Sequence, residues 1–458
     1  MMIRYFLYSI ILVVFIFNVV LLGEESASYW NEKGVQATQK GDWNEAVKCF
    51  EKAYRLKPDE EIIKENLFKS YLSLASYLIE KKKFNDALKW AKRARKLKNN
   101  KEVSKTLAIL YGNYAVYIAS KGKLNDAISY AYKAIEYDPS NKTLKDNYVN
   151  LTLNYAFSVD GDLRKNALLN VLKYKPDSVT ALSGLGNIYY DEDDLENAIK
   201  YYGETLKYDP DNDMIRYKYE KAKKEYSQEK NYKKTKRVRF TVKYEGIERS
   251  DLAWQVLNIL DEAYYLLRNK IGFWSAKKLT VIIYTGEKYK TVSGVPDWSG
   301  GLYDGKIRVK EGDISGNQKQ LKDILYHEYV HALIHERVGN EITVWMNEGL
   351  AQYFEPSRTW SDEYRKELAL TIDTPDWLPL KTLNTTFVKF EDAKKAAQAY
   401  KESYSVAYYL SKTYGEYSFI RLLDTIHQGD TFGEAFKKIY FIDLDTFETN
   451  WKFFLKTG

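Results

Sequence analysis

The chain has 458 residues, of which 29% are charged and 45% hydrophobic, a balance typical of globular rather than disordered or fibrous proteins. Its net charge of +7 is modest and its lysines are spread along the chain, so the composition does not favour a nucleic-acid-binding protein. The single cysteine, Cys49, excludes an intrachain disulfide and any C-x-x-C pair, while the length suggests about three domains.

The first 23 residues have the pattern of an export segment. Arg4 is the only charge before an apolar run from Tyr5 to Leu22, and Glu24 and Glu25 follow directly. The run is just long enough to span a bilayer, and no A-x-A cleavage site precedes Glu24. A cleaved signal peptide and a retained membrane anchor both remain open, with the anchor favoured. We therefore expect an exported protein, either membrane-anchored or free in the periplasm or a similar extracytoplasmic space.

Residues 28–230 contain an internal repeat. An alanine preceded by a polar pair recurs at intervals of 41, 40, 40 and 31 residues, at Ala46, Ala87, Ala127, Ala167 and Ala198. Small and aromatic residues recur around these alanines and a proline follows, as with Gly34, Phe50 and Pro58, which resembles the tetratricopeptide pattern. The pattern predicts about five helix pairs stacked as an α-solenoid. Such arrays usually bind protein segments, so we expect a protein partner, with a simple spacer as the alternative.

A different pattern begins after the repeats. Residues 231–237 are basic and predict a linker, and residues 238–458 then form the second domain. Alternation and short apolar runs predict four strands and one amphipathic helix at its start: strands over residues 237–244, 279–284, 300–304 and 306–310, and a helix over residues 251–270 with Ser250 as its N-cap.

The motif H-E-Y-V-H spans His327 to His331. It lies in a proline-free segment, residues 319–338, with apolar residues at helical spacings. Histidines four apart stack on one face of a helix, so both imidazoles can bind one metal ion. Glu328 can then reach a water on that ion and act as the general base. The spacing predicts a zinc hydrolase motif, with histidines that merely pack or face solvent as the alternative.

A second segment, W-M-N-E-G-L-A-Q-Y-F-E at residues 345–355, supplies a third metal ligand. Catalytic zinc usually takes three protein ligands, and Glu348 is the natural candidate, unless it is an ordinary surface carboxylate. H-E-x-x-H followed by N-E-G-x-A resembles the gluzincin metallopeptidases, and the likeness to their bacterial peptidase MA-like members covers residues 279–455. The resemblance implies one Zn²⁺ per chain and an α+β, thermolysin-like catalytic domain with a helical C-terminal part.

The run Y-K-E-S from Tyr400 to Ser403 resembles the aminopeptidase segment Y-E-K-G-A. The resemblance implies that Tyr400 stabilises the transition-state oxyanion. Ser403 and Tyr404 depart from the pattern, and the alternative is that Tyr400 is only a packing residue. Gln352 stands where thermolysin-like enzymes have an aspartate that supports a zinc histidine, so that role has no assigned residue. His335 is not expected to bind the metal, because it lies four residues past His331 rather than six.

The same resemblance bears on the substrate. It implies that an edge strand ahead of the zinc helix, here Lys306–Lys310, holds an extended peptide. The G-x-M-E-N segment of aminopeptidases has no counterpart in this chain, which favours an endopeptidase acting on peptides or proteins. The alternatives are a non-catalytic envelope scaffold that binds proteins through its repeats and carries a vestigial metal domain, and an envelope assembly factor that uses both halves.

Overall fold

The computed structural model describes residues 26–458 apart from 295–300, 315, 386, 388–389 and 391. These residues separate into two compact units: one runs to Ile188 and includes Tyr201–Asn212, and the other contains Tyr189–Lys200 and Asp213–Gly458. The predicted export segment, residues 1–23, lies outside the described residues. Within the described ranges, no helix combines the length and the apolar character that crossing a bilayer requires.

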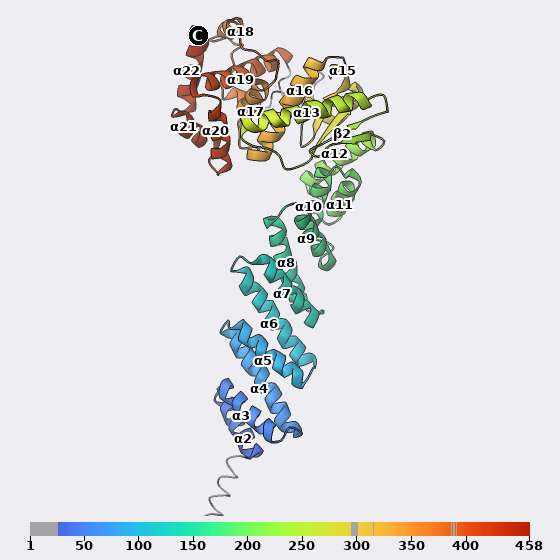
Figure 1. The fold of residues 1–458 in the computed structure, drawn as a ribbon, viewed down its shortest axis with the longest axis vertical. Helices are drawn as coiled ribbons and strands as arrows, with labels where there is room; N and C mark the ends of the chain where they lie inside the picture. Colours follow the sequence, from blue (N-terminus) through green and yellow to red (C-terminus); the bar gives the residue numbers. More distant parts are fainter. Residues whose placement is uncertain (1–25, 295–300, 315, 386, 388–389, 391) are drawn as a thin grey trace, which may run out of the picture. The chain divides into compact units, whose positions relative to one another are not determined.

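The repeat region consists of consecutive helices that form the five expected pairs. Their bounds are α2 (Ala27–Gln39), α3 (Trp43–Leu56), α4 (Glu61–Glu80), α5 (Phe84–Leu97), α6 (Lys101–Ala119), α7 (Leu124–Tyr137), α8 (Lys142–Ser158), α9 (Gly161–Tyr174), α10 (Val179–Asp191) and α11 (Leu195–Tyr208) (Figure 1). A Cβ at Gly34 would lie 2.6 Å from the ring of Phe50, and one at Gly186 would lie 2.5 Å from Tyr202. The glycines are therefore what lets the paired helices approach closely, which confirms the predicted solenoid.

The second unit contains a five-stranded mixed sheet in the order β1-β2-β3-β5-β4. Its strands are β1 (Lys233–Lys236), β2 (Phe240–Tyr244), β3 (Leu279–Tyr284), β4 (Gly301–Tyr303) and β5 (Ile307–Lys310). The strands β2, β3 and β5 are parallel, whereas β1 and β4 pair antiparallel to their neighbours. This mixed domain after the repeats confirms the predicted fold class.

Three local predictions differ from the structure. The segment predicted as a linker, residues 231–237, contains strand β1, because its backbone pairs with β2 despite its basic side chains. The predicted substrate-holding edge strand, Lys306–Lys310, is wrong: β5 lies between β3 and β4, so within the described residues β4 is the edge strand. Ser250 is the first residue of its helix rather than the cap, a position that Arg249 occupies.

One face of the sheet packs against α13 (Ser250–Ile271) and α16 (Gln318–Val338). Val281, Ile283, Ile307 and Val309 alternate along β3 and β5 and share one buried apolar cluster with the inner sides of these helices. The last two strands hold α16 in place, since β4 and β5 both contact it. The helix with the H-E-Y-V-H motif thus rests on the interior of the domain.

The opposite face of the sheet carries buried charges beside a smaller apolar cluster that includes Ile282 and Tyr284. Arg308 of β5 donates to Glu225 of α12 (Asp213–Glu229) over 2.7 Å, and Lys306 lies 3.0 Å from Asp193 and 3.1 Å from Glu225. Asp304, in the turn between β4 and β5, accepts from Arg308 at 3.0 Å and pairs with Lys221 at 2.8 Å. These ion pairs connect α12 to the hairpin formed by β4 and β5.

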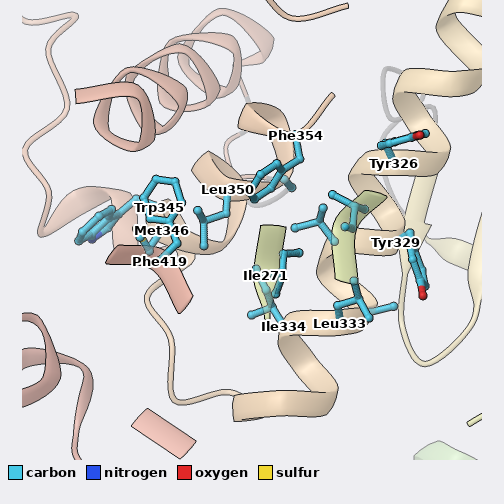
Figure 2. Packing of buried hydrophobic residues seen from close by; sticks show 14 of the residues in the cluster. Ile271, Tyr326, Tyr329, Leu333, Ile334, Trp345, Met346, Leu350, Phe354 and Phe419 are labelled. Atoms are coloured by element: carbon cyan, nitrogen blue, oxygen red, sulfur yellow. The ribbon is translucent and has the colours of Figure 1, made fainter. Parts of the chain in front are cut away.

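The C-terminal half is helical. It contains α17 (Val344–Tyr353), α18 (Asp362–Ala369), α19 (Ala393–Tyr414), α20 (Tyr417–His427), α21 (Phe432–Tyr440) and α22 (Leu444–Thr457), with a 3-10 turn (Thr382–Asn384) between α18 and α19. The shorter helices α14 (Gly286–Ser293) and α15 (Glu311–Ile314) precede α16. Figure 2 shows Trp345, Met346 and Leu350 of α17 in the same apolar core as Leu333 and Ile334 of α16. This shared core fixes α17 beside the helix that carries the histidines.

Candidate metal centre

Two neighbouring helices bring three potential metal ligands together. The Nε2 atoms of His327 and His331, one turn apart on α16, lie 3.1 Å from each other. Oε2 of Glu348, on α17, lies 3.3 Å from the first and 3.4 Å from the second. Within the described part of the chain, these three residues form the group of His, Cys, Asp and Glu side chains whose ligand atoms converge on one point.

The geometry fits a tetrahedral zinc ion. Bonds of about 2.1 Å at tetrahedral angles place neighbouring ligand atoms about 3.3–3.4 Å apart, close to the separations above. Oε2 of Glu348 is buried without a hydrogen-bond partner. Two imidazole nitrogens and a carboxylate oxygen that face one another at these distances are favourable around a cation and unfavourable without one, because their lone pairs converge.

The electrostatics of the three groups also favour a positive charge. Burial alone would lower the pKa of His327, but the carboxylates of Glu348 and Glu355 outweigh it and hold this pKa well above its ordinary value. Burial would raise the pKa of Glu348, yet the two histidines lower it below the ordinary range. Carboxylates that stabilise an imidazolium in this position would equally stabilise a divalent cation between the rings.

Glu355 supports the first histidine from behind. Its Oε1 lies 2.9 Å from Nδ1 of His327, and its Oε2 accepts from Arg358 at 2.8 Å. The contact orients the imidazole so that Nε2 points to His331 and Glu348. The sequence analysis left this role without a residue; Glu355 lies two residues past the end of α17, so its helical spacing from Glu348 does not reveal the contact.

Gln352, the residue at the position of the expected aspartate, does something else. Its Nε2 donates to the backbone carbonyl of Tyr400 over 2.8 Å. It therefore links α17 to α19 and helps to place Tyr400, rather than contacting a histidine.

Glu328 lies between the two histidines in sequence and is buried. It accepts a hydrogen bond from the backbone N–H of Tyr303 in β4, and burial raises the pKa of its carboxyl, an effect that the neighbouring histidines oppose. A Cβ on Gly301 would lie only 2.7 Å from Oε1 of Glu328. The edge strand β4 thus passes directly beside this carboxylate, and only glycine fits at that point.

Tyr400 of α19 faces the same place. Burial, followed by the carboxylates of Glu348 and Glu328, raises the pKa of its hydroxyl, so this group stays protonated and can donate a hydrogen bond. Two other tyrosines of α19 lie elsewhere: Tyr408 stacks on Trp360 with ring centroids 4.3 Å apart, and Tyr404 packs against the same ring at 5.9 Å.

His327, Glu328, Glu355 and Tyr400 line one open cleft of about 480 Å³. Its walls come from β4, α16, α17, the following loop and α19: Gly301, Gln320, Asp323, Ile324, His327, Glu328, Gln352, Glu355, Arg358, Ala397, Tyr400 and Lys401. His335 is outside it, exposed and edge-on to Tyr303 at 5.8 Å, as expected from its spacing. Glu341 is exposed in the turn after α16 and does not contact the three ligands.

The fold and the site together define a two-part protein: a helical repeat array, then a mixed domain with a His-His-Glu cluster in a cleft. Comparison with known families agrees with both parts. Residues 260–457 match the profile of the Peptidase MA superfamily, and residues 27–60 and 179–212 match the tetratricopeptide repeat. The chain therefore carries a Peptidase MA superfamily domain after tetratricopeptide repeats.

Among curated proteins, no match was found. Solved structures similar to this chain include a TPR protein with an unusual peptide-binding site, YrrB, with 12% identity over 44% of this chain and 95% of that chain and a TM-score of 0.20. The MamA protein shows 20% identity over 41% and 93%, with a TM-score of 0.22. The TPR2AB domain of yeast Sti1, solved as a complex with pHSP90, shows 17% identity over 44% and 85%, with a TM-score of 0.23.

Proposed function

We propose that the protein is a zinc-dependent metallopeptidase of the gluzincin type. The observation that carries the proposal is the convergence of His327 Nε2, His331 Nε2 and Glu348 Oε2 within 3.1–3.4 Å of one another, beside the buried carboxylate of Glu328 in an open cleft. Membership of a peptidase superfamily supports it.

Each residue of the site has a role in peptide hydrolysis. Zinc bound by the three ligands supplies a Lewis acid that lowers the pKa of a water to about 7. Glu328 accepts the proton of the attacking water and later gives it to the leaving amine, a task that its raised pKa favours. The hydroxyl of Tyr400 donates to the oxygen on which negative charge develops.

The cleft favours an endopeptidase. An aminopeptidase needs a carboxylate that binds the free amine of its substrate. Apart from Glu328, the carboxylates that line the described cleft already have partners: Asp323 accepts from Ser357, and Glu355 contacts His327 and Arg358. The edge strand β4, which passes beside Glu328, would pair with an extended peptide through main-chain hydrogen bonds and so accept many sequences.

The repeat array suggests how substrate reaches the cleft. Tetratricopeptide repeats indicate a protein or peptide partner, and we propose that the array recruits a substrate or an adaptor. The apolar run from Tyr5 to Leu22 supports export and attachment to, or release from, a membrane. We therefore propose that the protein acts outside the cytoplasm. Protease added to cells with an opened outer envelope should then degrade the chain.

The deciding experiment separates metal binding from catalysis. Glu348→Ala should lose bound zinc, whereas Glu328→Gln should keep about one zinc per chain and lose activity by about 10²–10⁴-fold, because only the proton transfer is removed. Zinc content is measured on the purified protein, and cleavage on a peptide library with and without chelator. A zinc-free parent, or zinc without chelator-sensitive cleavage, would instead support the non-catalytic scaffold.

A further inference from the structure

The outer side of α13 carries an exposed mixture of aromatic and arginine side chains. Trp254, Tyr265 and Trp274 are about half exposed. In the turn before β2, Val238 is 87% exposed and stands between Arg237 and Arg239, which lie over rings of α13. Trp254 and Tyr265 are eleven residues apart, three helical turns, and so lie on one face. Isolated exposed apolar residues are ordinary, but a cluster of this kind on one element indicates a surface that contacts something.

The arginines of this face lie over the rings rather than between carboxylates. Arg239 is 3.9 Å from the ring centre of Tyr264 and 5.7 Å from that of Tyr265, and Arg268 is 5.3 Å from that of Trp274. Neither arginine forms an ion pair with a carboxylate anywhere in the described ranges. Arg239 also donates to the hydroxyls of Tyr264 and Tyr265, and a stacked guanidinium keeps its remaining N–H donors for an anion.

Nearby charges leave the face positive. Arg237 lies over Trp254 at 5.6 Å but is neutralised by Asp261, and Glu262, at the flank of the helix, pairs with Lys322 at 2.6 Å. Arg239 also adjoins Lys278, because the backbone N–H of Leu279 donates to the carbonyl of Arg239 over 2.9 Å. Arg239, Arg268 and Lys278 therefore outnumber Asp251, an exposed carboxylate one turn before Trp254 on α13, while Asp261 and Glu262 are already paired.

We propose that this arginine–aromatic face, formed by Val238, Arg239, Trp254, Tyr265, Arg268 and Trp274, binds the surface of a membrane that contains anionic phospholipids. Tryptophan and tyrosine favour the headgroup level of a bilayer, where a ring is buried and its polar edge stays wet. Each unpaired arginine adds attraction to anionic headgroups. An acidic surface of another protein would also bind the arginines, but it would not explain the four exposed apolar side chains around them.

A reporter placed on the face tests the proposal in the full chain. Val238→Cys, in a Cys49→Ala background, is labelled with an environment-sensitive fluorophore and mixed with vesicles of phosphatidylcholine and phosphatidylglycerol. We expect increased emission that pure phosphatidylcholine does not produce, and that about 1 M salt reverses, because the screening length falls to about 3 Å. The control is a label at Phe453→Cys, which is also exposed, at 67%, on α22 and should not respond.

Arg239→Gln with Arg268→Gln should weaken the response by about fivefold for each charge. Lys412→Gln with Lys437→Gln removes two exposed cations from α19 and α21 and should leave it unchanged. If the chain also binds vesicles through residues 1–25, the emission of both labelled variants changes alike. The difference in emission between the Val238 and Phe453 labels therefore still reports on the arginine–aromatic face. The proposal is overturned if the two labels respond equally, if neutral vesicles act as well as anionic ones, or if only a soluble polyanion produces the response.

Discussion

Nδ1 of His327 lies 2.9 Å from Oε1 of Glu355, while the opposite ring nitrogen points to His331 and Glu348. The contact decides which ring nitrogen carries the proton, since an ionised carboxylate accepts a hydrogen bond and cannot donate one. Nε2 is then left with its lone pair free for a metal. Arg358, bound to the other oxygen of Glu355, fixes the carboxylate in turn.

Glu355→Gln should therefore weaken zinc binding without removing a ligand. An amide can present either its oxygen or its N–H₂ to the imidazole, so the ring loses its fixed orientation. We expect an affinity about 10–100-fold lower, measured by competition with a chromogenic chelator. Glu363→Gln, an exposed carboxylate on α18, is the control. An unchanged zinc affinity in the Glu355 variant would show that the contact does not support the metal centre.

The variant Tyr400→Phe should lower kcat and leave KM nearly unchanged, because the hydroxyl acts only where negative charge develops. Loss of one such donor reduces the rate by about 10²–10³-fold. Tyr404→Phe and Tyr408→Phe are matched controls, since both rings pack around Trp360. Steady-state kinetics on any cleaved peptide, with zinc content checked, measure the effect. A rate within a few-fold of the parent would make Tyr400 a packing residue.

The elements of the metal centre that depend on local spacing could be predicted from sequence. The four-residue interval between His327 and His331 requires only a helix to become a shared site, and the repeats follow from residues at fixed intervals such as Gly34 and Phe50. In both cases the relevant contact is made within one helix or between adjacent helices, so the chain order already contains it.

The elements that depend on distant pairing could not be predicted. The hairpin sequence identifies β4 and β5 as neighbours, but not that β5 joins β3 and leaves β4 at the edge. The strand β1 is too polar to be recognised, because its backbone pairs with β2 while its side chains are polar and mostly exposed. Likewise, the pairing of Glu225 on α12 with Arg308 on β5 joins residues 83 apart, which no local pattern reveals.

Gly349, next to the proposed metal ligand Glu348, should not tolerate a side chain. A Cβ there would lie 2.3 Å from the backbone oxygen of Ser403, and the backbone of α19 cannot turn aside as a side chain would. Gly349→Ala would force α17 and α19 apart, and we expect a loss of about 1–3 kcal/mol in the free energy of unfolding, together with reduced activity.

The control for this change is Gly433→Ala on α21, where a Cβ meets no atom within 4 Å. Since alanine is the better helix former, that variant should be unchanged or more stable by up to about 1 kcal/mol. Urea denaturation of both variants gives the comparison. If the two alanine variants are equally stable, the close approach of α17 and α19 does not constrain the fold.

Glu402, beside Tyr400 in sequence, should make the domain less stable as the pH rises. It is fully buried, accepts from Leu378 and Gln398 through Oε1, and has no partner at Oε2. Burial raises the pKa of its carboxyl from an ordinary 4.5 to about 8. Between these two values the unfolded chain releases the proton and the folded one retains it, so unfolding becomes easier by about 1.4 kcal/mol per pH unit.

The free-energy difference between Glu402→Gln and the parent isolates this effect, because other groups titrate alike in both. Glutamine keeps an acceptor for Leu378 and Gln398 but cannot ionise, so the variant should gain stability relative to the parent from about pH 5 to about pH 8 and show a constant difference at higher pH. Urea unfolding at several pH values measures it, with Glu363→Gln as the exposed control. A difference that does not change with pH would mean that Glu402 is ionised in the folded protein.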